Sequence, residues 1–163
     1  MPKHKLLQNR TFVFLLCLYV VGFIFGLFIN TGSYIYDDSN KNFWTIFFAN
    51  YWYIFLIWAL GFSFIGFIST TIIVFFRAFV FGILTKLLII NDFRSFIIIL
   101  ILEIIIFFPA LSIISLFSFK MSKEGFKIFY GDYNDSMFVK NYINLMLIIT
   151  VVIAVYSLII YYN

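Results

Sequence analysis

Two ionisable residues lie inside long apolar runs and are the first candidates for chemistry. Arg77, in the stretch VFFRAFVFG, is the only charge from Trp52 to Thr85, and Glu103 interrupts a second run, SFIIILILEIIIFFPALSIISLFSF. A charged side chain in hydrocarbon costs at least about 2.5–3.5 kcal/mol, so such residues face protein and have a partner. Two functions are consistent with this pattern: an ion pair that fixes helix packing, or a charge relay that serves transport.

The spacing around Arg77 indicates the face on which it lies. Gly66, Thr70, Ile73 and Arg77 follow each other at helical intervals, and small or hydroxylated residues mark helix–helix interfaces in membranes. Counted along their helices, Arg77 and Glu103 differ in depth by roughly 9 Å, at the edge of what two long side chains span. Three arrangements remain open: a direct pair, Arg77 bonded to helix-end carbonyls, or an acid from a partner subunit.

The residues needed for catalysis or for a cofactor are missing from the sequence. The only histidine is His4, no Cys/His cluster is present, and GFSFIG at 61–66 lacks the G-x-S-x-G spacing. No G-x-x-x-x-G-K-[ST] occurs either, so this chain does not bind ATP through a P-loop. We therefore expect a non-enzymatic protein with no metal and no cofactor.

Two further patterns could bind something. Ser112, Ser115 and Ser118 recur every three residues, a ridge that bonds its own backbone, packs against a neighbouring helix or lines a polar pore. The segment FKMSKEGFKIFY, residues 119–130, mixes aromatic residues with Lys120, Lys123 and Lys127. It suits a short interfacial amphipathic helix or a solvated loop, and it is a candidate docking element for a cytoplasmic partner.

The composition places these residues in a membrane protein. The chain has 163 residues, of which 64% are hydrophobic, 24% aromatic and 11% charged, whereas soluble domains have about 25% charged residues. The net charge of +4 shows no basic stripe, so we interpret it as a topology signal and expect no nucleic-acid partner. The single cysteine, Cys17, excludes an internal disulfide, and we interpret it as a packed core thiol.

Hydropathy predicts an all-α polytopic bundle forming one transmembrane domain, residues 1–163. Gly22 and Gly26 form a G-x-x-x-G pair that permits close helix approach, and Pro109 should kink the fourth helix or loosen one of its turns. Apolar runs of 18 or more residues are long enough to span a bilayer. The five predicted helices lie near 11–29, 46–65, 67–89, 95–119 and 141–162.

The positive charges predict the orientation of the bundle. With the N-terminus inside, seven basic residues are cytoplasmic and three are outside, which favours an inside N-terminus and an outside C-terminus. The seven are Lys3, Lys5, Arg10, Lys120, Lys123, Lys127 and Lys140. We expect a multi-pass protein of the bacterial cytoplasmic membrane.

The order of these features resembles the stage II sporulation protein M family of bacterial membrane proteins. The resemblance rests on GFIFG at 22–26, FFAN at 47–50, WALGFSFIG at 58–66, Arg77 eleven residues after Gly66, and Glu103 six residues before Pro109. It implies that Asn50 matches a family asparagine and Arg77 a family basic position. The chain departs from many relatives, which have a His-Gly and a Glu nearer the proline.

The resemblance implies non-enzymatic work in a membrane complex. Some family members accompany a larger membrane protein and a separate ATP-binding subunit in circular-bacteriocin clusters, where they assist maturation, secretion or immunity. The founding role is instead in sporulation, as an engulfment scaffold with cell-wall hydrolases. A short chain with little extramembrane mass favours the first setting, with the bilayer, other membrane subunits and a cytoplasmic ATPase as partners and with oligomerisation open.

Overall fold

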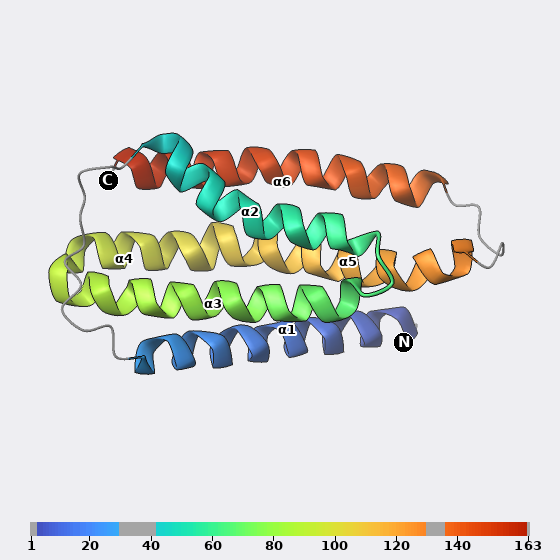
Figure 1. Ribbon diagram of the computed structural model, residues 1–163, viewed down its shortest axis with the longest axis horizontal. Coiled ribbons are helices and arrows are strands. Elements are labelled where there is room, and N and C mark those ends of the chain that lie inside the picture. Colours follow the sequence, from blue (N-terminus) through green and yellow to red (C-terminus); the bar gives the residue numbers. More distant parts are fainter. Residues whose placement is uncertain (1–2, 30–41, 130–135, 163) are drawn as a thin grey trace.

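The computed structural model describes residues 3–29, 42–129 and 136–162, with side chains described for 10–29, 42–123, 137 and 139–162. All of the elements in this part of the chain are helices. They form five long rods, because α4, η1 and α5 continue one another (Figure 1). The elements are α1 (Lys3–Phe28), α2 (Phe43–Gly61), α3 (Gly66–Asn91), α4 (Phe93–Leu102), the π-helical turn η1 (Glu103–Phe107), α5 (Phe108–Phe129) and α6 (Ser136–Tyr162).

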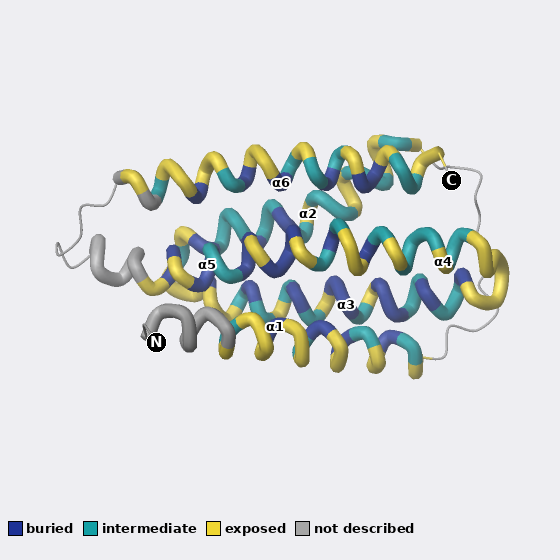
Figure 2. The backbone as a smooth tube through the Cα atoms, turned by 180° about the vertical axis from the view of Figure 1, so that it is seen from behind, coloured by how far each residue is buried: buried dark blue, intermediate teal, exposed yellow. Residues whose placement is uncertain are grey.

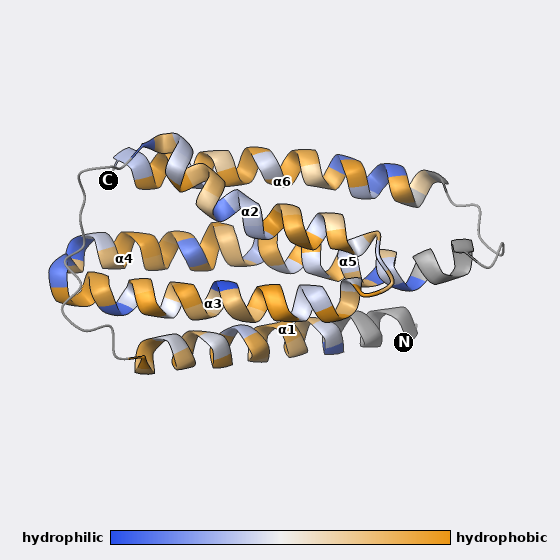
Figure 3. Cartoon of the chain, in the orientation of Figure 1, coloured by the Kyte–Doolittle hydropathy of each residue, from blue (hydrophilic) through white to orange (hydrophobic). Residues whose placement is uncertain are grey.

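All five rods are long and apolar enough to cross a membrane, which confirms the predicted number of spans. Figure 3 shows hydrophobic residues along every rod, with a few hydrophilic segments in the middle of the bundle. The two chain ends lie at opposite ends of the bundle, as an odd number of crossings requires (Figure 1). Which end faces the cytoplasm stays a prediction.

The helix bounds differ from the predicted ones, and one of the differences lies at the hairpin. The second helix begins at Phe43 and ends at Gly61, four residues before the predicted end. The turn that follows is closed by backbone bonds from Ser63 N–H to the Leu60 carbonyl and from Gly66 N–H to the Ser63 carbonyl. Phe62, Phe64 and Ile65 lie in this turn. Hydropathy cannot locate a turn made of apolar residues.

The rod that begins at Phe93 also runs further than predicted. It continues to Phe129, so the segment around Lys120 and Lys123 belongs to α5 and is neither a separate interfacial helix nor a loop. Three other bounds also differ: α1 begins at Lys3, eight residues earlier than predicted, α6 begins at Ser136, five residues earlier, and α3 ends at Asn91, two residues later. Residues 30–41, between the first two predicted helices, and residues 130–135, between the last two, lie outside the described residues.

The glycine pair of α1 packs α1 directly on α3. A Cβ on Gly26 would collide with the Phe79 carbonyl and lie 2.9 Å from the Gly82 Cα, and a Cβ on Gly22 would lie 2.7 Å from the Phe75 carbonyl. These contacts advance together along both helices, so α1 and α3 run in the same direction, as Figure 1 shows. The predicted close approach is therefore present, with α3 as the partner.

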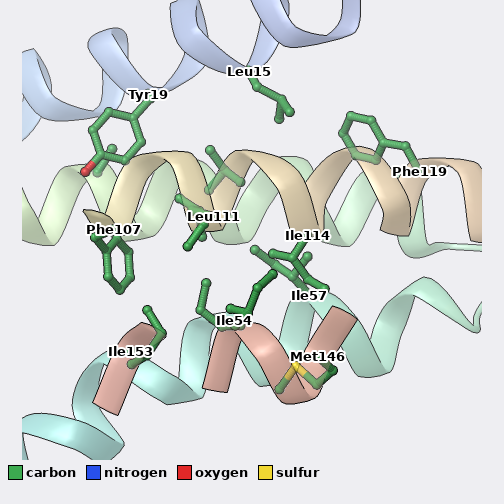
Figure 4. Packing of buried hydrophobic residues seen from close by; sticks show 14 of the residues in the cluster. Leu15, Tyr19, Ile54, Ile57, Phe107, Leu111, Ile114, Phe119, Met146 and Ile153 are labelled. Atoms are coloured by element: carbon green, nitrogen blue, oxygen red, sulfur yellow. The ribbon is translucent and has the colours of Figure 1, made fainter. Parts of the chain in front are cut away.

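The rod formed by α4, η1 and α5 lies in the middle of the bundle, and the apolar core surrounds its α5 half. Phe107, Leu111 and Ile114 meet side chains of α1, α2 and α6 there (Figure 4). Most exposed residues are apolar and form the outer faces of the rods, which Figure 2 shows as yellow stripes. Cys17 belongs to such an outer face, so its interpretation as a core thiol is wrong.

Candidate functional site

Arg77 and Glu103 form a direct ion pair in the middle of the bundle. Arg77 Nη2 lies 2.9 Å from Glu103 Oε2, and the two side chains are only 5% and 1% exposed. Counted from the turn at Asp92, which separates α3 from α4, Arg77 is 15 residues before and Glu103 11 residues after. The difference of four residues is about 6 Å of helix, which a long arginine side chain spans. Of the three arrangements left open by the sequence, the structure shows the direct pair.

Two tyrosines complete the shell of the carboxylate. The Tyr19 hydroxyl of α1 donates to Glu103 Oε1 at 2.5 Å, and the Tyr156 hydroxyl of α6 donates to Oε2 at 2.7 Å. Hydrogen bonds to an ionised acceptor are shorter and stronger than neutral ones, and buried tyrosine hydroxyls need a partner. Each carboxylate oxygen therefore has at least one donor, although the group is removed from water.

The guanidinium group is held by an amide and by aromatic rings. Arg77 Nη2 donates to Asn50 Oδ1 at 3.1 Å, and the Asn50 amide itself donates to the Ile46 carbonyl at 2.8 Å. The Phe107 ring centre lies 4.1 Å from Arg77 Cζ, within cation–π range. Arg77 Nε has no hydrogen-bond partner among the described residues. The charge is thus compensated, with one buried donor left over.

These five side chains come from all five rods. Tyr19 lies on α1, Asn50 on α2, Arg77 on α3, Glu103 on η1 and Tyr156 on α6. A hydrogen-bonded cluster of this kind fixes the rotation and depth of every rod relative to the others. We call Tyr19, Asn50, Arg77, Glu103 and Tyr156 the buried charge cluster.

Thr70 and Gly66 lie apart from this cluster, beside the hairpin turn. Thr70 Oγ1 is 3.0 Å from Ser118 Oγ, which also donates to the Ile57 carbonyl at 3.0 Å. A Cβ on Gly66 would lie 3.1 Å from the Gly61 Cα. Both residues therefore pack the hairpin, and they do not bind the charge pair.

The serine ridge of α5 packs against its neighbours. Ser118 bonds Ile57 of α2, Ser122 donates to the Ser63 carbonyl at 2.9 Å, and Ser115 donates to the Leu111 carbonyl of its own helix. Ser112, Ser115 and Ser118 are all buried. Tyr142 of α6 adds a bond to the Trp58 carbonyl near the end of α2, where carbonyls lack helical partners. Within the ridge, Ser118 thus bonds a neighbouring helix and Ser115 bonds its own backbone.

Pro109 lies two residues after the π-helical turn, which ends at Phe107. The Phe108 N–H bonds the Glu103 carbonyl, one residue further back than in an α-helix. Proline has no N–H and its ring clashes with the carbonyl four residues earlier, which here belongs to Ile105. The wider turn removes this conflict, so the predicted loosening of a turn by Pro109 is seen at Glu103–Phe107.

The lysines proposed for docking lie at the far end of α5. Lys120 and Lys123 are exposed on the later part of α5, and this part of the helix reaches the bundle end where α1 begins (Figure 1). The side chain of Lys127 lies outside the described part of the structure. Exposed Arg10 and Lys140 belong to the same end, because they lie near the starts of the α1 and α6 membrane spans.

Sequence reasoning missed Tyr19 and Tyr156. The chain has 11 tyrosines, and in membrane proteins this residue usually marks the interface. One signal was present: both lie well inside an apolar run, where a hydroxyl must find a hydrogen-bond partner. No group of three His, Cys, Asp or Glu residues that could hold a metal occurs in the described ranges.

The fold and the buried charge cluster define a polytopic α-helical membrane protein built around an internal ion pair. The family model described as "Stage II sporulation protein M" matches residues 11–160. The chain therefore belongs to the stage II sporulation protein M family. Neither a curated protein nor a solved structure matches it.

Proposed function

We propose that this chain is a non-enzymatic membrane subunit that assists maturation, secretion or immunity of a bacteriocin or similar peptide. It works in the bacterial cytoplasmic membrane with other membrane subunits and a separate ATP-binding partner. The connections between its helices leave little room for an extramembrane domain, because the longest of them joins Phe28 to Phe43. Its intramembrane charges bind each other, which suits a subunit that contributes structure to a complex.

The observation that carries the proposal is the extension of α5. This helix continues without a break from the packed core to Phe129, with Lys120 and Lys123 exposed on it. A helix that is continuous with the packed core holds a docked partner in a fixed position relative to the bundle better than a loop does. The lysines would attract an acidic surface of a cytoplasmic partner, since opposite charges steer and orient association.

The sporulation role is the second candidate, and the family to which the chain belongs favours it. In that case the partners are cell-wall hydrolases on the outer side, and they bind the end of the bundle opposite to Lys120 and Lys123. The two proposals therefore differ in both the identity of the partner and the end of the bundle that it contacts.

Affinity purification of the tagged full chain from its native membrane tests the proposal. We expect an ATP-binding subunit to co-purify with the wild type, and its recovery to fall for Lys123→Glu and further for Lys120→Glu/Lys123→Glu. Arg94→Glu is the matched control, because it reverses an exposed charge at the other end of the bundle. Unchanged recovery in the lysine variants, or a wall hydrolase in place of the ATPase, would overturn it.

A further inference from the structure

The π-helical turn divides the fourth span into two halves with different rotations. One residue of an α-helix corresponds to about 100° of rotation, so the extra residue in η1 rotates α4 by about that angle relative to a regular helix. Glu103 is the first residue of this turn, and its carbonyl accepts the long bond from Phe108. The charged residue and the backbone irregularity therefore coincide.

The two halves are held very differently. All ten residues of α4 are described and none is buried, whereas α5 contributes Leu111, Ile114 and Phe119 to the core. The main packing partner of α4, apart from η1, is α3. Segments with few buried apolar contacts are the ones that move at low free-energy cost. By this criterion α4 is the weakly held half and α5 the fixed half.

An apolar groove beside α4 provides space for movement. It has a volume of about 300 Å³ and lies between α1 and the junction of α4 with η1. Leu16 and Val20 line it on one side, Leu100 and Ile104 on the other, and Phe81 of α3 also borders it. The groove is therefore a space beside α4 that side chains of the packed core do not fill.

The ion pair holds the present register. Glu103 bonds Arg77, Tyr19 and Tyr156, and all of these lie on elements other than the fourth span. If η1 became regular helix, α4 would rotate and Glu103 would be pulled away from these donors. The loss of charge-assisted bonds opposes that change, as long as the pair is intact.

We propose that η1 is a conformational switch in which α4 rotates relative to α5, and that the Arg77–Glu103 pair locks it in the π register. In the released register, α4 rotates by about 100° and fills the groove beside α1. A side-chain tip on a helix of about 10–12 Å diameter then moves by about 8 Å. Any event that breaks the pair, such as engagement of a partner subunit, releases α4 and leaves α5 in place.

Spin-label distances in the full chain, reconstituted in lipid vesicles, test this switch. In a Cys17→Ser background, labels at exposed Val13 of α1 and Ile97 of α4 report the rotation of α4. Labels at exposed Phe25 of α1 and Ile113 of α5 report the fixed half. Two substitutions weaken the π register: Glu103→Gln removes the charge, and Pro109→Ala removes the residue that disfavours a regular helix. The Glu103→Gln/Pro109→Ala double variant removes both and should show the largest change.

We expect the α1–α4 distance to shift by up to about 8 Å, or to show a second population, in these variants, while the α1–α5 distance stays unchanged. Glu124→Gln is the matched control, since it changes the other glutamate, which lies about 32 Å further along the same rod. An unchanged α1–α4 distance in the double variant, which lacks both the charge pair and the proline, would overturn the proposal. Equal shifts in both distances would overturn it as well, because they would report a loosened bundle.

Discussion

Glu103 is the acceptor at the centre of the buried charge cluster, and its two oxygens are divided among three donors. Tyr19 bonds one oxygen, while Arg77 and Tyr156 share the other. A buried carboxylate is tolerated only when such bonds replace its hydration, and a buried arginine only when an acid balances it. Each residue of the pair would therefore destabilise the fold if the other were removed.

This dependence predicts a rescue. Arg77→Met should lower the free energy of unfolding by about 3–5 kcal/mol, because it leaves the Glu103 carboxylate buried and unpaired. Adding Glu103→Gln removes that charge and keeps an oxygen that accepts bonds from the tyrosines. The double variant should then be more stable than Arg77→Met alone, as measured by SDS titration in mixed micelles. Additive losses in the double variant would show that the pair contributes little through its charges.

At the residue scale, the sequence was sufficient to identify the charged members of the buried charge cluster but not the two tyrosines. Arg77 and Glu103 could be singled out because ions are rare in apolar runs, and helical rise placed them at similar depth. Asn50 was found only through the family resemblance. Tyr19 and Tyr156 were not identified because tyrosine in a membrane protein usually indicates the membrane interface. Only the packed structure shows that their hydroxyls donate to Glu103.

At the scale of the elements, the seam between α1 and α3 holds α1 on the bundle. α1 and α3 share more contacts than any other pair of elements, and the backbones approach where Gly26 faces Gly82. Without a hydrophobic driving force between helices in lipid, such close packing supplies much of the attraction. Tyr19 reaches Glu103 only because this seam fixes α1.

A methyl group in this seam should therefore have effects out of proportion to its size. Gly26→Ala places a Cβ against the Phe79 carbonyl and the Gly82 Cα, which are backbone atoms that cannot rotate away. We expect a loss of about 1–3 kcal/mol in the SDS titration, the usual cost of overpacking. Val21→Leu, on the exposed face of α1, is the control and should change stability by less than about 0.5 kcal/mol. Equal stability of the two variants would contradict the role of the seam.

The ends of a helix could be predicted where the sequence changes from apolar to polar residues. They could not be predicted where apolar residues continue through the turn. The break at Asn91 and Asp92 was visible in the sequence, and Asp92 indeed accepts bonds from the Arg94 and Ser95 N–H groups at the start of α4. The hairpin between Gly61 and Gly66 contains mostly apolar residues, so the predicted end of the second helix was four residues too late. Pro109 predicted a kink or a loosened turn in the fourth helix. Neither the proline nor the hydropathy could show that the loosened turn would be π-helical or which residues it would include.

At the scale of the whole molecule, the bundle has a basic end. Arg10, Lys120, Lys123 and Lys140 are exposed there, while Arg94 is exposed near the opposite end. The surface between the ends is mainly apolar and is suited to lipid. Positive residues stay on the cytoplasmic side during membrane insertion, so this distribution favours an inside N-terminus.

This orientation predicts which ends can be labelled from outside. In a Cys17→Ser background, Arg94→Cys should react with a membrane-impermeant maleimide in intact cells, because it lies at the outer end. Lys123→Cys should react only after permeabilisation, because it lies at the basic, cytoplasmic end. Both positions are exposed, so a difference in labelling reports the side of the membrane and not burial. The reverse pattern would place the N-terminus outside, and it would also remove the cytoplasmic ATPase as a partner for the lysines of α5.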